Sequence, residues 1–427
     1  MTDRPNTDPA WLRGMTMRRV SRRDLFKAGG VGVTALSLGA ILAACGTGDS
    51  SGTGTGGDSG SIDWSAKPSG TLDFANWPLY IDKEKVNGEV VRPSLLQFTE
   101  DTGIEVNYRE VIQGNSTFFG KIQPQLAAGQ PTGWDIIVIT NGETLTRLKS
   151  LNYLVELPSD MRPNFDKYAA PSVVDPAYDP GNKYTMAWQS GLTGIGWDPT
   201  QIAELRPDNP TITSMNDLFD PAFAGKVGMF GDNADLPNLT MIGMGIDPTT
   251  STVDDWNAAA EKLTQQRDDG IVRQYYEQNY INALSNGDVA ITMAWSGDIF
   301  QTNLSGDSEG LQFCVPTEGA VIWTDNMMIP VGAAHPVDAM TYMDYVYDPD
   351  VAGQMAQWIN YITPVPDSKA FVTSLYEDTG DAYYKNVAES PLVYPTPADE
   401  EKLYVYRVLT EDEQLEWNGI FQPIYQS

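Results

Sequence analysis

Few of the side chains that commonly carry out catalysis are present in this sequence. The 427 residues include one histidine and two cysteines, so His335 is the only imidazole available to a serine or cysteine nucleophile. Two cysteines and one histidine cannot form a Cys/His zinc cluster or a disulfide framework. Residues 48–52 match the G-x-S-x-G pattern, but no strand precedes them and no helix follows, so they do not form a nucleophile elbow. The sequence therefore predicts no catalytic residue, no metal site and no cofactor.

Trp323 and Asp325 are the two residues whose types and spacing most favour ligand binding. They stand two positions apart in a segment that reads as extended, so both side chains point to the same side. The face of a tryptophan ring attracts an ammonium group, and a carboxylate supplies the counter-charge that a buried cation needs. For any single aromatic residue the alternative is ordinary core packing, but this pair favours contact with a ligand.

The composition indicates a folded and strongly acidic protein. Hydrophobic residues make up 41% of the chain, which is enough to form cores and excludes wholesale disorder. The 57 acidic against 27 basic residues give a formal charge of −30, which disfavours binding to nucleic acid phosphates. This charge is compatible with a cationic ligand, although we expect most of the surplus carboxylates to solvate the surface.

The first 44 residues differ from the rest of the chain. They carry seven basic against three acidic residues, a net charge of +4, which leaves −34 on the remainder. Ser21–Lys27, with the sequence S-R-R-D-L-F-K, resembles the twin-arginine export motif, which directs folded proteins across the membrane. The apolar residues 28–44 are diluted by glycines and are too few to span a bilayer comfortably. Residues 1–44 are therefore predicted to be a cleavable signal peptide.

The end of this apolar stretch predicts a lipid anchor. Leu42–Cys45, with the sequence L-A-A-C, resembles a bacterial lipobox, in which the cysteine is acylated and becomes the new N-terminus. Residues 46–61 are almost entirely Gly, Ser, Thr and Asp, a composition typical of a flexible linker. We expect an exported protein held by Cys45 at the outer face of the cytoplasmic membrane, in the cell envelope or periplasmic space. Cys314 then has no partner and is expected to be a small buried apolar residue.

Strands and helices alternate after the linker. The pattern of apolar residues predicts three strands and three helices, in the order strand 71–75, helix 92–102, strand 103–111, helix 118–128, strand 134–139 and helix 143–149. The third strand is a continuous apolar run, as in a sheet covered on both faces. This alternation predicts a parallel α/β sheet.

A second α/β region follows, with strands at 225–230 and 289–295 and helices at 254–267 and 280–285. Thr252 is the expected N-cap of the first of these helices. Two extended segments, at 185–197 and 320–330, link the two regions. Two such crossovers predict an α/β fold of two lobes that exchange chain, with a ligand cleft between the lobes.

Five segments carry a family resemblance. They are Asn76–Ile81 with an N-W-x-x-Y pattern, Trp134–Val138, Gly287–Asp298, Glu318–Gly319 followed by Trp323–Met327, and Ile359–Pro364. Their order and spacing resemble those of the polyamine (spermidine/putrescine) substrate-binding proteins of ABC importers, which have the type II periplasmic-binding-protein-like fold. The resemblance covers about the whole chain after the linker.

The resemblance also implies which residues contact the ligand. Thr140 takes a small hydroxyl position, Asp325 is the principal anchor for an amine, and Asp235 is favoured over Asp232 to meet the second amine from the other lobe. Capping of the following helix is the alternative for both residues. The implied aromatic box consists of Trp77, Tyr80, Trp295, Trp323 and Tyr361.

Two positions depart from the family pattern. Asn141 and Gly142 stand where polyamine-binding proteins often have a tyrosine, and Trp417–Asn418 stands where they often have a glutamine. The sequence leaves open whether Asn233 or Asp235 lines the cleft. These departures concern the exact ligand more than its class.

The resemblance implies a monomeric, lipid-anchored binding protein without catalysis, which closes on a small cationic solute and docks on importer permease subunits. A sugar, a quaternary amine or a peptide is the alternative ligand within the same fold. A surface glycoside hydrolase with paired carboxylates and a purely structural surface lipoprotein are the other classes. The expected segments are the signal peptide 1–44, the lipidated linker 45–69, one lobe of 70–196 with 323–366, and the other lobe of 197–322 with 367–427.

Overall fold

The computed structural model describes residues 62–86, 89–305, 310–396 and 401–426. The predicted signal peptide, Cys45 and the linker as far as residue 61 lie outside the described residues. Within the described ranges, no helix is both long enough and apolar enough to cross a membrane.

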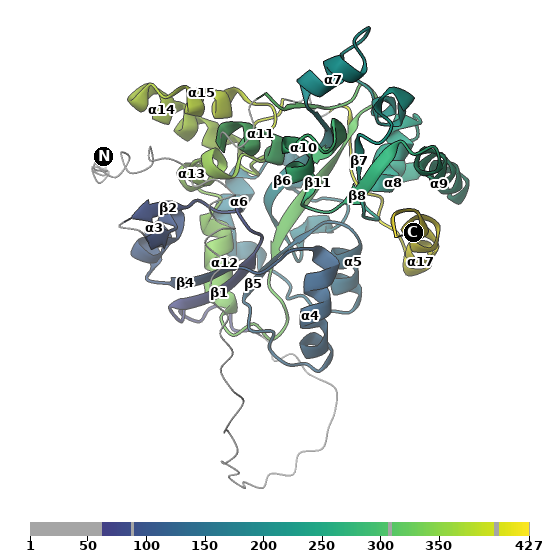
Figure 1. Ribbon diagram of the computed structural model, residues 1–427. Coiled ribbons are helices and arrows are strands. Elements are labelled where there is room, and N and C mark those ends of the chain that lie inside the picture. The colour runs from purple at the N-terminus through teal and green to yellow at the C-terminus, as the bar shows by residue number, and fades with distance from the viewer. Residues whose placement is uncertain (1–61, 87–88, 306–309, 397–400, 427) are drawn as a thin grey trace, which may run out of the picture.

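A mixed sheet of ten strands runs through the described part of the chain (Figure 1). Eight of the strands lie in the order β4-β1-β5-β11-β6-β9-β7-β8, while β10 pairs with β6 and β12 pairs with β11. The ten strands are β1 Thr71–Asn76, β4 Glu105–Glu110, β5 Ile136–Thr140, β6 Met186–Trp197, β7 Val227–Phe230, β8 Val272–Tyr276, β9 Ile291–Trp295, β10 Gln312–Cys314, β11 Ala320–Met328 and β12 Leu403–Tyr404. A separate hairpin consists of β2 Glu84–Val86 and β3 Glu89–Val91.

The first half of the sheet consists of the parallel strands β4, β1 and β5. Its helices are α3 (Pro93–Thr102), α4 (Asn115–Ala127) and α5 (Glu143–Ser150). Proline opens α3, and Gly103, with a φ of 76°, ends it in the left-handed conformation that glycine adopts without strain. This half confirms the predicted alternation of strands and helices and their parallel arrangement.

The second half consists of the parallel strands β9, β7 and β8. Its helices include α8 (Asp235–Gly243), α9 (Val253–Asp268) and α10 (Tyr280–Ser285). The predicted N-cap is confirmed: the Thr252 hydroxyl accepts a hydrogen bond from the backbone N–H of Asp255 in a capping box. The strand β8 was not expected from the sequence, and α8 is the helix expected after Asp232 and Asp235.

The strands β6 and β11 occupy the centre of the sheet and join its halves. They are antiparallel to each other, β11 also pairs with β5, and β6 also pairs with β9. Both predicted crossover segments are therefore present as long strands. Between Asp325 and Asn326 of β11 the register shifts, because β6 carries one extra residue, Trp188.

Further helices cover this sheet and pack beside it (Figure 1). They are α6 Pro163–Tyr168, α7 Pro199–Leu205, α11 Ser296–Ser305, α12 Pro336–Tyr345, α13 Pro349–Ile359, α14 Lys369–Thr379, α15 Ala382–Glu389 and α17 Glu411–Tyr425. Short 3-10 turns are found at Ser159–Met161, Pro171–Val173, Pro180–Asn182, Met215–Phe219, Pro221–Phe223, Pro248–Thr250 and Pro366–Ser368.

The hydrophobic cores follow the two halves of the sheet. One large cluster lies on the second half and includes Trp256 and Trp417, and two clusters lie on the first half, around Phe74 and around Phe119. A smaller cluster joins α13 to α14 and α15. The lobe boundaries expected from the sequence stay a prediction.

Asp338, which is 1% exposed, fastens the start of α12 to the chain just before β1. Its carboxylate accepts hydrogen bonds from the backbone N–H groups of Ser69 and Gly70, each at 2.8 Å. We expect Asp338→Ala to lower the free energy of unfolding by about 1–3 kcal/mol, because both N–H groups lose a charged acceptor. Urea denaturation measures the change.

The control is Asp378→Asn, which changes an exposed carboxylate near the end of α14. This variant should stay within about 0.5 kcal/mol of the parent. Indistinguishable unfolding midpoints for the two variants would contradict the proposed fastening role.

Candidate ligand-binding site

Asp325 lies on β11 and is 5% exposed. Its Oδ2 accepts a hydrogen bond from the Tyr80 hydroxyl at 2.8 Å, and its Oδ1 accepts one from the Thr140 hydroxyl at 2.6 Å. No lysine or arginine among the described residues forms an ion pair with it. Burial raises the pKa of Asp325 to about 6, although both hydroxyl donors act in the opposite direction.

The two hydroxyl donors are themselves held in place. Thr140, at the end of β5, lies directly opposite Asp325 in the antiparallel register. The Asn115 side-chain amide donates to the Thr140 hydroxyl at 2.9 Å, and its oxygen accepts the Thr140 N–H at 3.1 Å. The loop after β1 that carries Tyr80 is fixed by the Trp188 indole N–H, which donates to the Tyr80 carbonyl at 3.1 Å.

Three aromatic rings form a chain that begins at this carboxylate, with Tyr80 in contact with Asp325. The ring centroids of Trp323 and Tyr361 are 5.5 Å apart, and those of Tyr80 and Tyr361 are 5.7 Å apart with the rings nearly perpendicular. Two glycines make this packing possible. A Cβ on Gly191 would stand 2.3 Å from the Trp323 ring, and one on Gly297 would stand 2.4 Å from the Tyr361 ring.

A second buried carboxylate lies at the start of α8. Asp235, which is 3% exposed, accepts hydrogen bonds from the Trp295 indole N–H at 2.9 Å and from the Tyr406 hydroxyl at 2.7 Å. Burial raises its pKa. The N-cap residue of α8 is Ala234, without a side-chain cap. Asp232 holds the chain at this point instead, because its Oδ1 accepts the backbone N–H groups of Ala234 and Asp235. Burial and the neighbouring Asp235 carboxylate raise the pKa of Asp232.

Thr193 on β6 connects the two carboxylate groups. Its hydroxyl accepts the indole N–H of Trp323 at 3.1 Å, and it also hydrogen-bonds Asp235. Trp295 and Tyr406 pack against the core clusters of both sheet halves. The two carboxylates and their aromatic neighbours therefore form one continuous site at the junction of the halves.

Seven of the eight predicted ligand residues are brought together in this way: Tyr80, Thr140, Asp235, Trp295, Trp323, Asp325 and Tyr361. Trp77 follows β1, and its indole N–H donates to the carbonyl of Val138 at 3.1 Å. Its ring packs against the hydrophobic clusters of the first half. The hydrogen-bond partner of Trp77 is therefore a backbone carbonyl of β5 and not a carboxylate of the site.

The loop residue Asn233 is directed to α17. Its side chain contacts Asn418 at 2.7 Å and Tyr425 at 2.8 Å, and the Trp417 indole donates to its carbonyl at 2.8 Å. Trp417 and Asn418 therefore anchor α17. Tyr406 was not expected in the site from the sequence, since no recognised motif surrounds it and only the folded chain brings it to Asp235.

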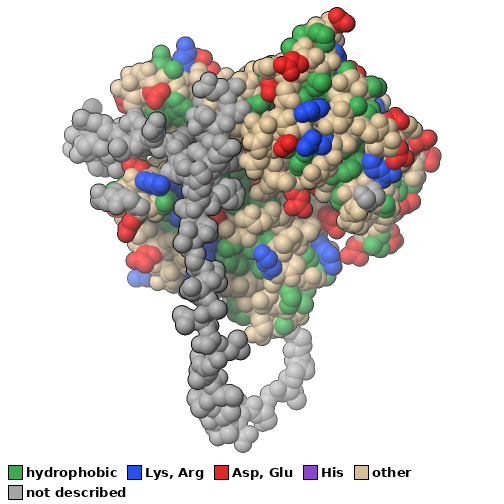
Figure 2. All heavy atoms as spheres, viewed as in Figure 1, with side chains coloured by type: hydrophobic (Ala, Val, Ile, Leu, Met, Phe, Trp, Pro, Cys, Tyr) green, Lys and Arg blue, Asp and Glu red, His purple; other side chains and the backbone are tan. Residues whose placement is uncertain are grey.

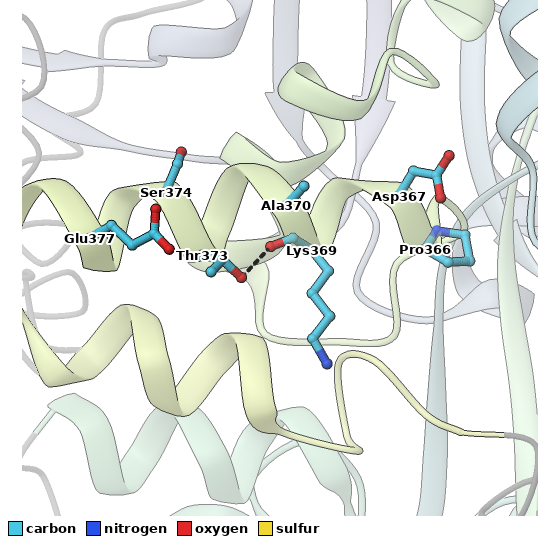
Figure 3. A pocket seen from close by; sticks show the side chains of 7 residues that line it. All are labelled: Pro366, Asp367, Lys369, Ala370, Thr373, Ser374 and Glu377. Carbon is cyan, nitrogen blue, oxygen red and sulfur yellow. Dashed lines mark hydrogen bonds between the residues drawn. The ribbon is translucent and has the colours of Figure 1, made fainter.

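Two hollows on the surface lie away from these residues. One of about 520 Å³ runs along α14, and its lining side chains include Asp367, Lys369 and Glu377 (Figure 3). The other, of about 450 Å³, is lined by Gln113 and residues 274, 275 and 277–279. The first hollow contains no aromatic ring. The face of the molecule in Figure 2 carries scattered Asp and Glu side chains, consistent with their expected role in solvation.

Cys314, on β10, is partly buried against the second-half core. Burial raises the pKa of its thiol to about 12, so the reactive thiolate is scarce near neutral pH. This environment agrees with the expectation of a small, largely buried apolar residue.

A mixed sheet with two halves and a shared buried site defines a binding protein in which two lobes meet around a solute. Residues 95–382 match the family of bacterial extracellular solute-binding proteins, and the chain belongs to this family. This membership confirms the prediction of a solute-binding protein rather than an enzyme.

Curated relatives share about a quarter of their residues with the chain. The putrescine-binding periplasmic protein PotF of Escherichia coli is 27% identical over 350 residues, which cover 79% of this chain and 86% of PotF. The spermidine/putrescine-binding periplasmic protein of Salmonella typhimurium is 25% identical over 340 residues, which cover 79% of this chain and 84% of the relative.

Solved structures share the fold. The spermidine/putrescine ABC transporter substrate-binding protein PotD of Streptococcus pneumoniae gives a TM-score of 0.67 at 23% identity, covering 84% of this chain and 99% of PotD. The TpPotD lipoprotein of Treponema pallidum gives a TM-score of 0.67 at 15% identity, covering 84% of this chain and 100% of that protein. These similarities confirm the predicted two-lobed periplasmic-binding-protein-like fold.

The contact between Gly191 and Trp323 can be tested directly. We expect Gly191→Ala to displace the Trp323 ring, to lower the free energy of unfolding by about 1–3 kcal/mol and to shift the tryptophan fluorescence. Gly120→Ala is the matched control, because a Cβ on Gly120, within α4, meets nothing within 4 Å. An unchanged stability and spectrum for Gly191→Ala would show that Trp323 is not packed in this way.

Proposed function

We propose that this protein binds a polyamine such as putrescine or spermidine between its lobes and delivers it to the permease of an ABC importer. The observation that carries the proposal is the buried Asp325 carboxylate, which is held by the hydroxyl groups of Tyr80 and Thr140. The Tyr80 ring continues into the rings of Tyr361 and Trp323, and no lysine or arginine among the described residues pairs with the carboxylate. The names of the relatives PotF and the Salmonella protein, which include putrescine and spermidine, support the proposal.

The chemistry of a polyamine matches this environment. Each carboxylate oxygen of Asp325 accepts one protein hydrogen bond and has capacity for another donor. An ammonium group there would gain a charge-assisted hydrogen bond, and each tryptophan or tyrosine face would add about 0.5–2 kcal/mol. The methylene groups between the amines would lie against the same rings. Asp235, on the second-half side, would receive the other amine.

Closure of the lobes on the ligand would occur by a hinge motion. The chain passes between the sheet halves at the central strands β6 and β11, so we place the hinge there. The predicted lobes, residues 70–196 with 323–366 and 197–322 with 367–427, would be the moving bodies. A ligand that contacts both Asp325 and Asp235 would favour the closed form.

Export and anchoring complete the proposal. The family consists of bacterial extracellular proteins. An export signal is expected for such a protein, and residues 21–27 resemble the twin-arginine export motif. Cys45 would carry the lipid and tether the folded part by the linker at the outer face of the cytoplasmic membrane. We expect a monomer that contacts the membrane through this lipid alone and docks on the permease subunits in its closed form.

Calorimetric titration of residues 62–427 with putrescine, spermidine, a neutral sugar, a quaternary amine and a short peptide tests the ligand class. We expect saturable binding of the polyamines. Asp325→Asn should weaken it by about a hundredfold or more, because a buried ammonium loses its charged partner. Asp367→Asn, which changes an exposed carboxylate of the surface hollow in Figure 3, is the matched control and should bind normally. Binding of the sugar alone would overturn the polyamine assignment.

The raised pKa of Asp325 also predicts a pH dependence. In the protein without ligand, the Asp325 carboxyl group has a pKa of about 6. Only about a tenth of it is ionised at pH 5, whereas alkyl ammonium groups remain charged. Polyamine affinity should therefore be constant above pH 7 and fall by about tenfold or more at pH 5. Dissociation constants measured from pH 5 to 8 check this. An affinity that is the same at pH 5 and pH 7.5 would mean that the cation does not rely on this carboxylate.

A further inference from the structure

Tyr406 reaches the site from a segment near the C-terminal end of the described chain. Its hydroxyl donates to Oδ1 of Asp235 at 2.7 Å. An edge carbon of its ring lies 3.9 Å from the position that a Cβ on Gly142 would occupy. Asp235 begins α8 in the second half of the sheet, and Gly142 follows β5 in the first half. The Tyr406 side chain therefore lies against both halves of the sheet, at Asp235 and at Gly142.

The segment that carries Tyr406, residues 401–410, is fastened to the second half on both sides of this residue. Before it, β12 pairs with the start of β11, and the Ala320 N–H donates to the Lys402 carbonyl at 3.0 Å. After it, the Arg407 guanidinium donates to the Ser251 carbonyl and pairs with Glu413 of α17.

Helix α17 adds to this attachment. It packs on α9 through the rings of Trp417 and Trp256, whose centroids are 5.1 Å apart. Tyr406 is thus expected to move with the second lobe. Its contact with Gly142 then forms only when the lobes close.

Gly142 carries no side chain, and its φ of 131° is a conformation that residues with a side chain rarely adopt. A Cβ at this position would be in ordinary van der Waals contact with the Tyr406 ring. Tyr406 is therefore the side chain that lies against the backbone of residue 142. The partly buried phenol also remains a donor: removal from water and the charge of Asp235 raise the pKa of Tyr406, and the Asp325 carboxylate adds to the shift.

We propose that Tyr406 is a specificity-determining residue, whose ring closes the Asp235 end of the site against Gly142 and limits the length of the amine that fits. The inference rests on the proposed function. Asp235 already accepts the donors of Trp295 and Tyr406, one on each oxygen, and also hydrogen-bonds Thr193. In this proposal the Tyr406 ring limits extension of the ligand toward Gly142. A short diamine fits this closed end better than a longer triamine.

The experiment measures dissociation constants of putrescine and spermidine by calorimetry for the parent, Tyr406→Ala, Tyr406→Phe and the control Tyr404→Phe. Tyr404 lies on the same segment, with its ring against Gly319 at the end away from the site. Tyr406→Ala should change the ratio of the two dissociation constants by about tenfold in favour of spermidine. Contacts in a binding pocket discriminate between similar ligands by factors of about this size. Tyr406→Phe keeps the ring, so it should weaken both amines and leave the ratio within about twofold. Tyr404→Phe should match the parent.

The outcomes separate this inference from the proposed function. If the parent binds neither amine, the proposed function fails and the inference fails with it. If the parent binds, the inference is overturned when the ratio of the putrescine and spermidine dissociation constants for Tyr406→Ala stays within twofold of the parent ratio. This holds even if both affinities fall, because an equal loss would mean that Tyr406 only supports the fold. Thermal unfolding of each variant verifies that it is folded, and Tyr406→Phe provides the test of the hydroxyl if Tyr406→Ala does not fold.

Discussion

A buried carboxylate that pairs with no lysine or arginine among the described residues is the constraint on which the site depends. Removing Asp325 from water disfavours its charged form, and the two hydroxyl donors from Tyr80 and Thr140 offset only part of that cost. The donors come from the loop after β1 and from the end of β5, while Asp325 stands on β11. The central strand thus directs its charge toward the end of β5 and the loop after β1, and a cation would supply a counter-charge there.

Three buried aspartates, Asp338, Asp325 and Asp235, differ in the donors that hold them. Asp338 accepts hydrogen bonds from backbone N–H groups, and these donors cannot turn away without local unfolding. Asp325 and Asp235 accept theirs from hydroxyl and indole groups, which can adjust when an ammonium arrives. The many carboxylates of this acidic chain therefore have three roles: solvation of the surface, hydrogen bonding to the backbone and the proposed recognition of cations.

The strands, the crossovers and the pairing of Trp323 with Asp325 could be predicted because each follows from the local sequence. Apolar runs identify β5 and β9, the alternation along an extended segment puts Trp323 and Asp325 on one side, and Thr252 with Asp255 forms a recognisable cap. The choice between Asp232 and Asp235 could not be made locally, since either can cap α8. It is decided by tertiary contacts, because Trp295 and Tyr406 both reach Asp235.

Tyr406 shows why the rest of the site could not be predicted from the sequence. Its neighbours in the chain form only a two-residue strand, and its position follows from attachment of residues 401–410 to the second half of the sheet. The sequence shows Asn141 and Gly142 where the family often has a tyrosine, but such a departure identifies an absent group and not its substitute. Only the fold brings a ring from 264 positions further along the chain to within 3.9 Å of that space. If the lobes close as proposed, a side chain carried by the opposite lobe would complete the site only on closure, so the shape of the site and the motion of the lobes would be linked.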